Sequence, residues 1–136
     1  MIKKLLLSGI CICLLFSLSA CTYKSNKKIS EEEIEAQIEE YEQYLKDTYP
    51  DETFTVEIWQ EYGTSIGSAG FPDYEGYMLR QVCTDSKGNR FKVYSMPKGE
   101  HTDDYEAVLD GRTHYNEKGQ EVFYDENGEI KSVVEW

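Results

Sequence analysis

The chain has 136 residues, with 26 acidic and 14 basic side chains and a net charge of −12. This length supports one small domain rather than several. An acidic surface of this kind repels phosphate backbones and anionic headgroups, so we expect no nucleic acid among the partners.

The first residues are typical of a secretory signal. Lys3 and Lys4 form a positive n-region, and residues 5–18 form an apolar segment of the length usual for a signal peptide. A membrane-spanning helix needs roughly 20 apolar residues, and this segment ends earlier. The sequence therefore predicts a leader peptide rather than a spanning helix.

The segment Leu18-Ser19-Ala20-Cys21 resembles the lipobox of bacterial lipoproteins, in which an aliphatic residue and two small residues precede a cysteine. The resemblance implies cleavage before Cys21, a diacylglyceryl group on its thiol, and retention on the outer face of the cytoplasmic membrane. Thr22 stands where an Asp commonly favours inner-membrane retention in Gram-negative cells, so a Gram-positive source is favoured. An ordinary secreted protein and an uncleaved signal anchor are the alternatives.

Processing at this site would change the charge and the cysteine content. Two lysines leave with the leader, so the mature chain has 12 basic and 26 acidic side chains, a net charge of −14. Cys11 and Cys13 leave as well, and Cys21 becomes a thioether. Only Cys83 keeps a thiol, so we expect no intramolecular disulfide.

Three segments are expected along the chain. Residues 1–20 are the signal peptide, residues 21–29 are the lipidated cysteine and its tether, and residues 30–136 are a single α+β domain. The tether is polar and basic. It is either a spacer or a segment that lies near anionic lipid headgroups, which attract lysine at close range.

A helix is predicted after Ser30. Ser30 is a favoured N-cap, and Glu33 stands three positions on, as a capping box requires. The sequence Tyr49-Pro50 ends the helix. Apolar residues recur at spacings of four, three and four and form one stripe that we expect to pack on a sheet: Ile34, Ile38, Tyr41 and Leu45.

The period then changes from helical to alternating. Phe54, Val56 and Ile58 alternate with other side chains and predict a strand with one buried face. A glycine-rich loop is expected over residues 63–73, and a second strand over residues 77–84. A turn at residues 85–89 then leads to a third strand over residues 90–96.

After Pro97 the pattern is less regular. Thr102 or Asp103 is a candidate N-cap, and Gly111 stands where a C-cap glycine belongs, so a short helix is expected between them. Three short strands are then predicted, over residues 112–115, 120–124 and 129–135.

Two similar units, at residues 115–120 and 124–129, occur nine positions apart. An EF-hand calcium loop needs oxygen ligands at its first, third and fifth positions and a glycine at its sixth. Alignment on Gly128 puts Phe123, which has no side-chain oxygen, first. Alignment on Gly119 puts a lysine fifth, so the calcium interpretation fails for both units.

A turn explains both units and a third copy at residues 85–89. Each copy has Asp or Asn first and Gly fourth. A type I turn followed by a glycine in the left-handed region requires this pattern, because the first side chain bonds the backbone ahead and glycine accepts positive φ. We therefore predict three hairpin turns. The Tyr-[Asn/Asp]-x-x-Gly unit resembles the short YD-type repeats of bacterial surface proteins.

These elements together predict an α+β fold. One N-terminal amphipathic helix is expected to pack on an antiparallel β-meander, with short hairpin strands at the C-terminus. This order of elements is similar to that of the inhibitory PepSY-type domains of secreted proteases and wall enzymes, and the mature domain resembles small bacterial surface lipoproteins. The resemblance implies a binding or inhibitory role.

Side chains that carry chemistry are few. Cys83 alternates with apolar residues on a strand, so a buried structural thiol is favoured over a nucleophile. His101, Asp103 and Asp104 are the weak candidates for a metal site, because they lack a fourth ligand and a helical spacing. No Ser-His-Asp signature, phosphate-binding loop or HExxH motif occurs. We expect no catalytic residue, no cofactor and no enzymatic activity.

Exposed aromatic side chains are the candidate binding surface: Trp59, Phe71, Tyr74 and Tyr94, beside the loop at 63–73 and the acidic face of the helix. The first hypothesis is a membrane-anchored module that binds a protein or peptide of the cell envelope. The alternative is a binder of a small ligand or metal cation through His101, Asp103 and Asp104. A third hypothesis is an enzyme that uses Cys83.

Overall fold

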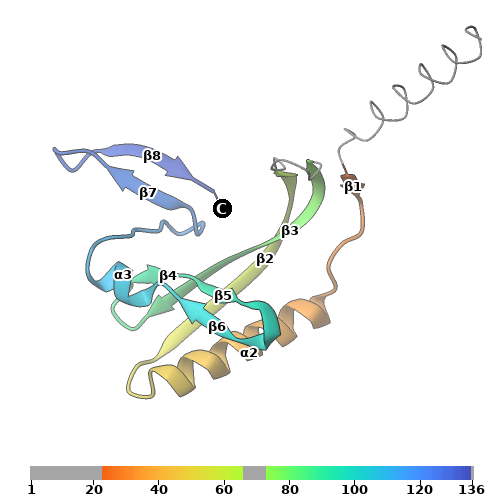
Figure 1. Ribbon diagram of the computed structural model, residues 1–136, viewed down its shortest axis with the longest axis horizontal. Coiled ribbons are helices and arrows are strands. Elements are labelled where there is room, and N and C mark those ends of the chain that lie inside the picture. Colours follow the sequence, from red (N-terminus) through yellow and green to blue (C-terminus); the bar gives the residue numbers. More distant parts are fainter. Residues whose placement is uncertain (1–22, 66–72, 136) are drawn as a thin grey trace, which may run out of the picture. The chain divides into compact units, whose positions relative to one another are not determined.

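The computed structural model describes residues 23–65 and 73–135 (Figure 1). The predicted signal peptide, the lipobox with Cys21, and Phe71 lie outside the described residues. The chain divides into two compact units. Unit 1 is residues 1–28 with 61–78, and unit 2 is residues 29–60 with 79–136. Residues 61–78 thus group with the N-terminal segment.

The chain is a mixed α+β protein, as predicted. Its elements in order are β1 (Tyr23–Ser25), α2 (Glu31–Thr48), β2 (Phe54–Ser65), β3 (Tyr74–Asp85), β4 (Arg90–Phe91), β5 (Val93–Ser95), the 3₁₀ turn η2 (Pro97–Gly99), β6 (His101–Asp103), α3 (Tyr105–Leu109), β7 (Glu121–Tyr124) and β8 (Ile130–Val134).

Helix α2 begins and ends where the sequence predicts. The Ser30 side chain accepts a hydrogen bond from the Glu33 N–H at 3.1 Å, and the Ser30 N–H donates to the Glu33 carboxylate at 3.2 Å. This reciprocal capping box satisfies two N–H groups that a helix start leaves without partners. Tyr49 is the C-cap, and its N–H donates to the Leu45 carbonyl.

The main core of unit 2 lies between α2 and the sheet. Leu45 and Phe91 are fully buried, and Tyr41 is 3% exposed. The rings of Phe54 and Tyr105 contact Phe91 at centroid distances of 5.4 and 4.6 Å. Of the apolar stripe predicted on the helix, Tyr41 and Leu45 are buried in this core and Ile38 packs against it, whereas Ile34 is half-buried and lies outside the cluster. The other buried partners come from three strands: Val56, Cys83 and Val93.

The two long strands differ from the prediction in length and in burial. Strand β2 continues to Ser65, so Gly63 lies in a strand rather than in the expected loop. In β3 the adjacent residues Val82 and Cys83 are both buried. Adjacent strand residues point to opposite faces, so β3 is covered on both faces, which an alternating pattern does not predict.

The expected tether contains a strand. β1 pairs with β3 in parallel, with Tyr23 opposite Tyr74 and Ser25 opposite Gly76. The sheet order is β1-β3-β2, and β4 also pairs with β3. The sequence did not predict β1, because a strand of three residues at a sheet edge shows no hydrophobic periodicity. Backbone hydrogen bonds alone hold such a strand in the sheet.

The predicted third strand at 90–96 is wrong as a single element, because it divides at Lys92. Its first part, β4, pairs antiparallel with β3, while β5 pairs antiparallel with β6. At the break, the Lys92 N–H donates to the Asp104 side chain at 2.8 Å. The Gln81 side-chain amide accepts from the Val93 N–H and donates to the Val93 carbonyl. Gln81 thus replaces a backbone partner, and the chain can leave one sheet for another.

The short helix α3 starts later than predicted. Thr102 and Asp103 lie in β6, and Asp104 is the N-cap without a side-chain capping bond. The helix end is as predicted: Gly111 has φ of 74°, its N–H donates to the Val108 carbonyl, and the next N–H donates to the Ala107 carbonyl. These two bonds form a Schellman motif, which favours glycine.

All three predicted turns are present and share one geometry. The side chains of Asp85, Asn116 and Asp125 each accept two backbone N–H groups, from the residues two and four positions ahead. The fourth residues, Gly88, Gly119 and Gly128, have φ of 87°, 69° and 80°. Strands β7 and β8 confirm the two last predicted strands, but residues 112–115 contain only an isolated bridge from Tyr115 to Glu121.

Candidate binding surfaces

The C-terminal hairpin exposes large apolar side chains. Phe123 is 40%, Tyr124 48%, Ile130 64% and Val133 46% exposed. All four lie on β7 and β8, which form a two-stranded antiparallel sheet (Figure 1). Large apolar side chains that are exposed together on adjacent strands mark an interaction site more often than scattered single residues do. Strands were expected at residues 120–124 and 129–135, and β7 and β8 lie there. Their exposure was not predicted, because it depends on contacts with segments that are distant in the sequence.

The pairing register places these side chains on both faces of the hairpin. Val122 pairs with Val133, and Phe123 pairs with Ser132. An irregularity after Phe123 then brings Tyr124 opposite Ile130. Residues that are directly opposite share a face, so Phe123 lies on one face and the Tyr124–Ile130 pair lies on the other. A stable two-stranded ribbon normally covers one apolar face, and here neither is covered completely.

A hollow of about 220 Å³ lies between residues 111–114 and β7. Its lining includes the basic side chain of Arg112 and the ring of His114. The His114 ring meets Tyr124 edge to face, with centroids 5.2 Å apart. This hollow continues the apolar surface of the hairpin and adds a cation and an imidazole at its border.

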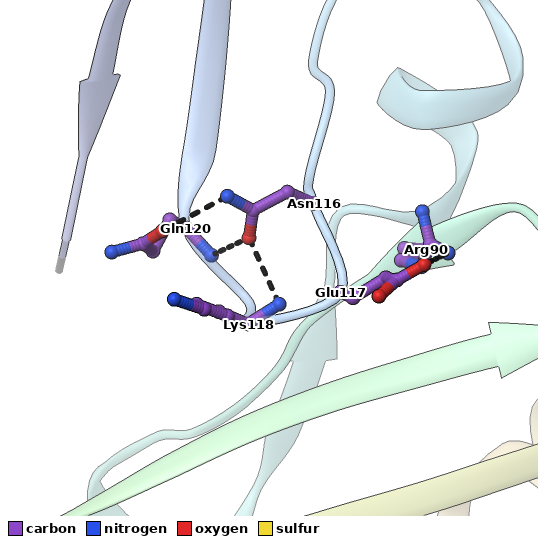
Figure 2. A pocket seen from close by; sticks show the side chains of 5 residues that line it. All are labelled: Arg90, Asn116, Glu117, Lys118 and Gln120. Atoms are coloured by element: carbon purple, nitrogen blue, oxygen red, sulfur yellow. Dashed lines mark hydrogen bonds and ion pairs between the residues drawn. The ribbon is translucent and has the colours of Figure 1, made fainter.

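A second hollow, of about 390 Å³, lies at the turn over residues 116–120 (Figure 2). Figure 2 shows that its polar groups bond one another. The Asn116 side chain holds the N–H groups of Lys118 and Gln120, and its amide donates to the Gln120 side chain at 2.9 Å. Arg90 lies 3.5 Å from the Glu117 carboxylate. The lining atoms stabilise a turn, so we assign no ligand to this hollow.

The predicted aromatic surface is more internal than expected. Trp59 is half-buried rather than exposed, and it has interaction partners. Tyr74, in unit 1, is half-buried, and its hydroxyl donates to the Tyr77 carbonyl at 3.1 Å. Tyr94 is 39% exposed, but its hydroxyl contacts Asp104 and Tyr115.

The candidate metal ligands are engaged with the protein itself. Asp103 accepts the hydroxyls of Tyr44 at 2.6 Å and Tyr49 at 2.9 Å. Asp104 accepts the Lys92 N–H and the hydroxyl of Tyr115. Among the described residues, no group of three His, Cys, Asp or Glu side chains is arranged to hold a metal ion.

His101 joins β6 to helix α2. Its ring stacks on Tyr44 with centroids 5.4 Å apart and meets Tyr41 edge to face. The His101 Nε2 lies 2.9 Å from the Glu40 carboxylate, although its direction is not that of a regular hydrogen bond. His101 and Asp103 thus both contact α2, and they stabilise its packing rather than forming an open site.

Tyrosine–carboxylate hydrogen bonds are a general feature of unit 2. The buried Asp85 accepts the Tyr105 hydroxyl at 2.8 Å. Burial, with the hydrogen bond to Asp103, raises the pKa of Tyr44 to about 12, and burial also raises the pKa values of Tyr105 and Tyr115. The hydroxyls of Tyr44, Tyr105 and Tyr115 therefore remain protonated at neutral pH and donate hydrogen bonds to carboxylates. These tyrosines hold elements of unit 2 together.

The Cys83 thiol lies in the core with no exposed surface. Burial, followed by the charge of Asp104, raises its pKa to about 12. The thiolate is the reactive form of cysteine, and it is negligible here at neutral pH. This environment agrees with the structural role expected for Cys83.

No helix among the described residues has the length and hydropathy needed to span a membrane. Comparison of the chain with protein-family models, with curated proteins and with solved structures gives no match.

Proposed function

We propose that the chain is a lipid-anchored, extracytoplasmic and non-enzymatic module that binds a protein or peptide of the cell envelope through its C-terminal hairpin. The anchor in this proposal is the lipobox cysteine, Cys21. Helix α2, packed on the strands of the meander, is the scaffold, and the hairpin β7–β8 is the contact surface.

The observation that carries the proposal is the exposure of four large apolar side chains on two adjacent strands. Fully burying one such side chain stabilises a complex by roughly 1.5–3 kcal/mol, and aromatic side chains are enriched at the centres of interfaces. Among the described strands, β8 has β7 as its only neighbour. An open strand edge beside apolar side chains can pair with an extended segment of a partner.

The acidic tip of the hairpin indicates the charge of the partner. Asp125, Glu126 and Glu129 are exposed at the turn, and the whole chain has a net charge of −12. Like charges oppose association and opposite charges steer it. A partner segment that is extended and apolar with basic flanks fits this surface better than a second copy of the chain does.

The alternative, a binder of a small ligand or cation, has less support. Its residues His101, Asp103 and Asp104 contact Glu40, tyrosines and backbone within unit 2. A cation would have to compete with these contacts.

Photo-cross-linking in intact cells tests the proposal. A photoreactive residue at Ile130, which is 64% exposed, should yield one dominant protein adduct. The matched control carries the same residue at Lys87, an exposed position in another hairpin turn, and should not yield that adduct. A second substitution at the residue opposite Ile130, Tyr124→Ser, should weaken the adduct. If photoreactive residues at positions 130 and 87 gave the same adducts, the hairpin would not be the contact surface.

A further inference from the structure

Unit 1 carries a surface of tyrosine and lysine side chains on β1, β2 and β3. Lys24 of β1 is in register with Glu75 of β3, and their charged groups are 2.9 Å apart. Tyr62 of β2 donates its hydroxyl to Glu75 at 3.2 Å, and its ring meets Tyr77 edge to face at 5.3 Å. The Lys28 ammonium lies 5.7 Å from the centre of the Tyr77 ring. We call these five side chains the Tyr–Lys surface.

The composition of this surface suits the headgroup region of a bilayer. Tyrosine places an apolar ring beside a polar hydroxyl and is enriched where membranes meet water. Lysine extends its apolar stem and keeps its ammonium in the polar layer. Tyr62 is 48% exposed, and Lys24 and Lys28 are exposed, so the surface offers both groups.

The position of Cys21 brings this surface close to the proposed anchor. Tyr23, the first residue of β1, follows Cys21 by two positions. An extended chain advances at most about 3.3–3.6 Å per residue, so the covalent chain allows about 7 Å between the two Cα atoms. Because β1 is hydrogen-bonded to β3, a lipid on Cys21 would hold the edge of this sheet at the membrane rather than release it on a long tether.

The difference in net charge between the two units also favours unit 1 as the part that contacts a membrane. The described part of unit 1 has three basic and three acidic side chains and is neutral, whereas unit 2 has 9 basic and 23 acidic side chains, a net charge of −14. Anionic headgroups repel unit 2 and attract lysines within a Debye length. Electrostatic repulsion from an anionic membrane is therefore weaker for unit 1 than for unit 2.

We propose that the Tyr–Lys surface binds the headgroup layer of an anionic membrane and is a second contact beside the lipid on Cys21. This inference rests on the lipidation in the proposed function. The lipid supplies the insertion, while Tyr62, Tyr77 and the lysines fix which part of the sheet faces the bilayer. A diacylglyceryl group has two acyl chains and anchors a protein stably by itself, so the proposed contact orients the sheet and is not needed for anchoring.

Lysine footprinting of the lipidated protein tests this inference. The mature protein is reconstituted in vesicles of phosphatidylglycerol and phosphatidylcholine, in phosphatidylcholine vesicles, or in neutral detergent micelles. It is then acetylated with a membrane-impermeant reagent and analysed by mass spectrometry. Lys24 and Lys28 should react about fivefold more slowly in the anionic vesicles than in micelles. Lys87 and Lys98, two of the exposed lysines of unit 2, should react equally in both.

Two controls separate the contact from the anchor. Tyr62→Ser removes the exposed ring and leaves Cys21 intact, and it should restore most of the labelling of Lys28. If Lys24 and Lys28 change no more than Lys87, or if the protection survives Tyr62→Ser unchanged, the Tyr–Lys surface makes no contact of its own. The intact mass of the protein in the same sample shows independently whether Cys21 carries the lipid. A missing lipid overturns the anchor as well as this inference, whereas a lipidated protein with equal labelling overturns this inference alone.

Discussion

The main core and the C-terminal hairpin use the same kinds of residue in opposite ways. Around α2, Leu45 and Phe91 have no exposed surface, whereas Ile130 on β8 is 64% exposed. Both regions lie in unit 2. The comparison teaches that apolar content alone does not indicate stability. The side chains of the core pack within the chain, whereas those of the hairpin stay exposed and form the contact surface that we propose.

The tyrosines repeat this contrast. Tyr44, Tyr49 and Tyr105 in the core region donate their hydroxyls to carboxylates on other elements. Tyr124 in the hairpin is 48% exposed and contacts a histidine ring at its edge. In this acidic chain, tyrosine hydroxyls therefore join one element to another by hydrogen bonds, whereas Tyr124 belongs to the contact surface that we propose.

The largest effect should come from Leu45→Asp in the core. The substitution removes a buried side chain, which typically costs about 2–5 kcal/mol, and it leaves a charge without a partner. Native domains have only about 5–15 kcal/mol of stability, so we expect no cooperative thermal transition by circular dichroism. The exposed position Glu42 on the same helix supplies the control, Glu42→Asp. A melt of Leu45→Asp like that of wild type would refute the packing of α2.

The next effect separates two turns with the same sequence pattern. A Cβ on Gly119 would lie 2.3 Å from the Gln81 carbonyl oxygen, whereas a Cβ on Gly128 would meet nothing within 4 Å. Both glycines have positive φ, so alanine at either position costs about 1–2 kcal/mol in backbone strain. Chemical denaturation should show Gly119→Ala to be clearly more destabilising than Gly128→Ala. Equal losses would mean that the turn at 116–120 does not pack on β3.

A smaller loss is expected for Tyr105→Phe. The buried Asp85 would keep its Asn89 and backbone donors but lose the Tyr105 hydroxyl, and a hydrogen bond to a charged group contributes about 1.5–3 kcal/mol. Tyr62→Phe is the control, because its hydroxyl bonds are exposed. The free energy of unfolding should fall for Tyr105→Phe and change little for Tyr62→Phe. The reverse order would contradict a structural role for this pair.

The raised tyrosine pKa values predict a gradual loss of stability in alkali. The ordinary tyrosine pKa is 10, and that of Tyr44 in the folded chain is about 12. A group with a raised folded pKa contributes fully below its unfolded pKa and loses its contribution as the pH rises through the folded value. Stability should therefore decline between pH 10 and 12, and tyrosinate absorbance should rise together with unfolding. A native protein whose tyrosines all titrate with the ordinary pKa of 10, without unfolding, would count against the buried hydroxyls.

The smallest effect is expected for Ile130→Ser on the hairpin. The side chain is mostly exposed, and surface substitutions usually change stability by no more than about 0.5 kcal/mol. The melting temperature should stay near that of wild type, while the cross-linked adduct in cells should decrease. A large loss of stability would show that Ile130 belongs to a core, and the contrast between the two regions would then disappear.

The sequence by itself determined the features that depend on neighbours along the chain. The capping box of Ser30 and Glu33 specified the start of α2, because its bonds span only three residues. The Asp or Asn and Gly pattern specified three turns with the same bonds, and the flanking runs specified β7 and β8. The alternation of Val56 with exposed neighbours in β2 could also be predicted, because it too depends only on adjacent residues.

Tertiary structure alone decided which of these local features contact one another. The chain breaks at Lys92 because Asp104 and Gln81, distant in sequence, satisfy its backbone. The turn at Gly119 packs against Gln81 and the turn at Gly128 does not, although their sequences match. Tyrosine hydroxyls reach carboxylates up to 59 residues away. In the hairpin Val122 is buried, whereas Phe123, Tyr124, Ile130 and Val133 are left partly exposed. Contacts between distant segments depend on the shape of the whole fold, and no local pattern encodes that shape.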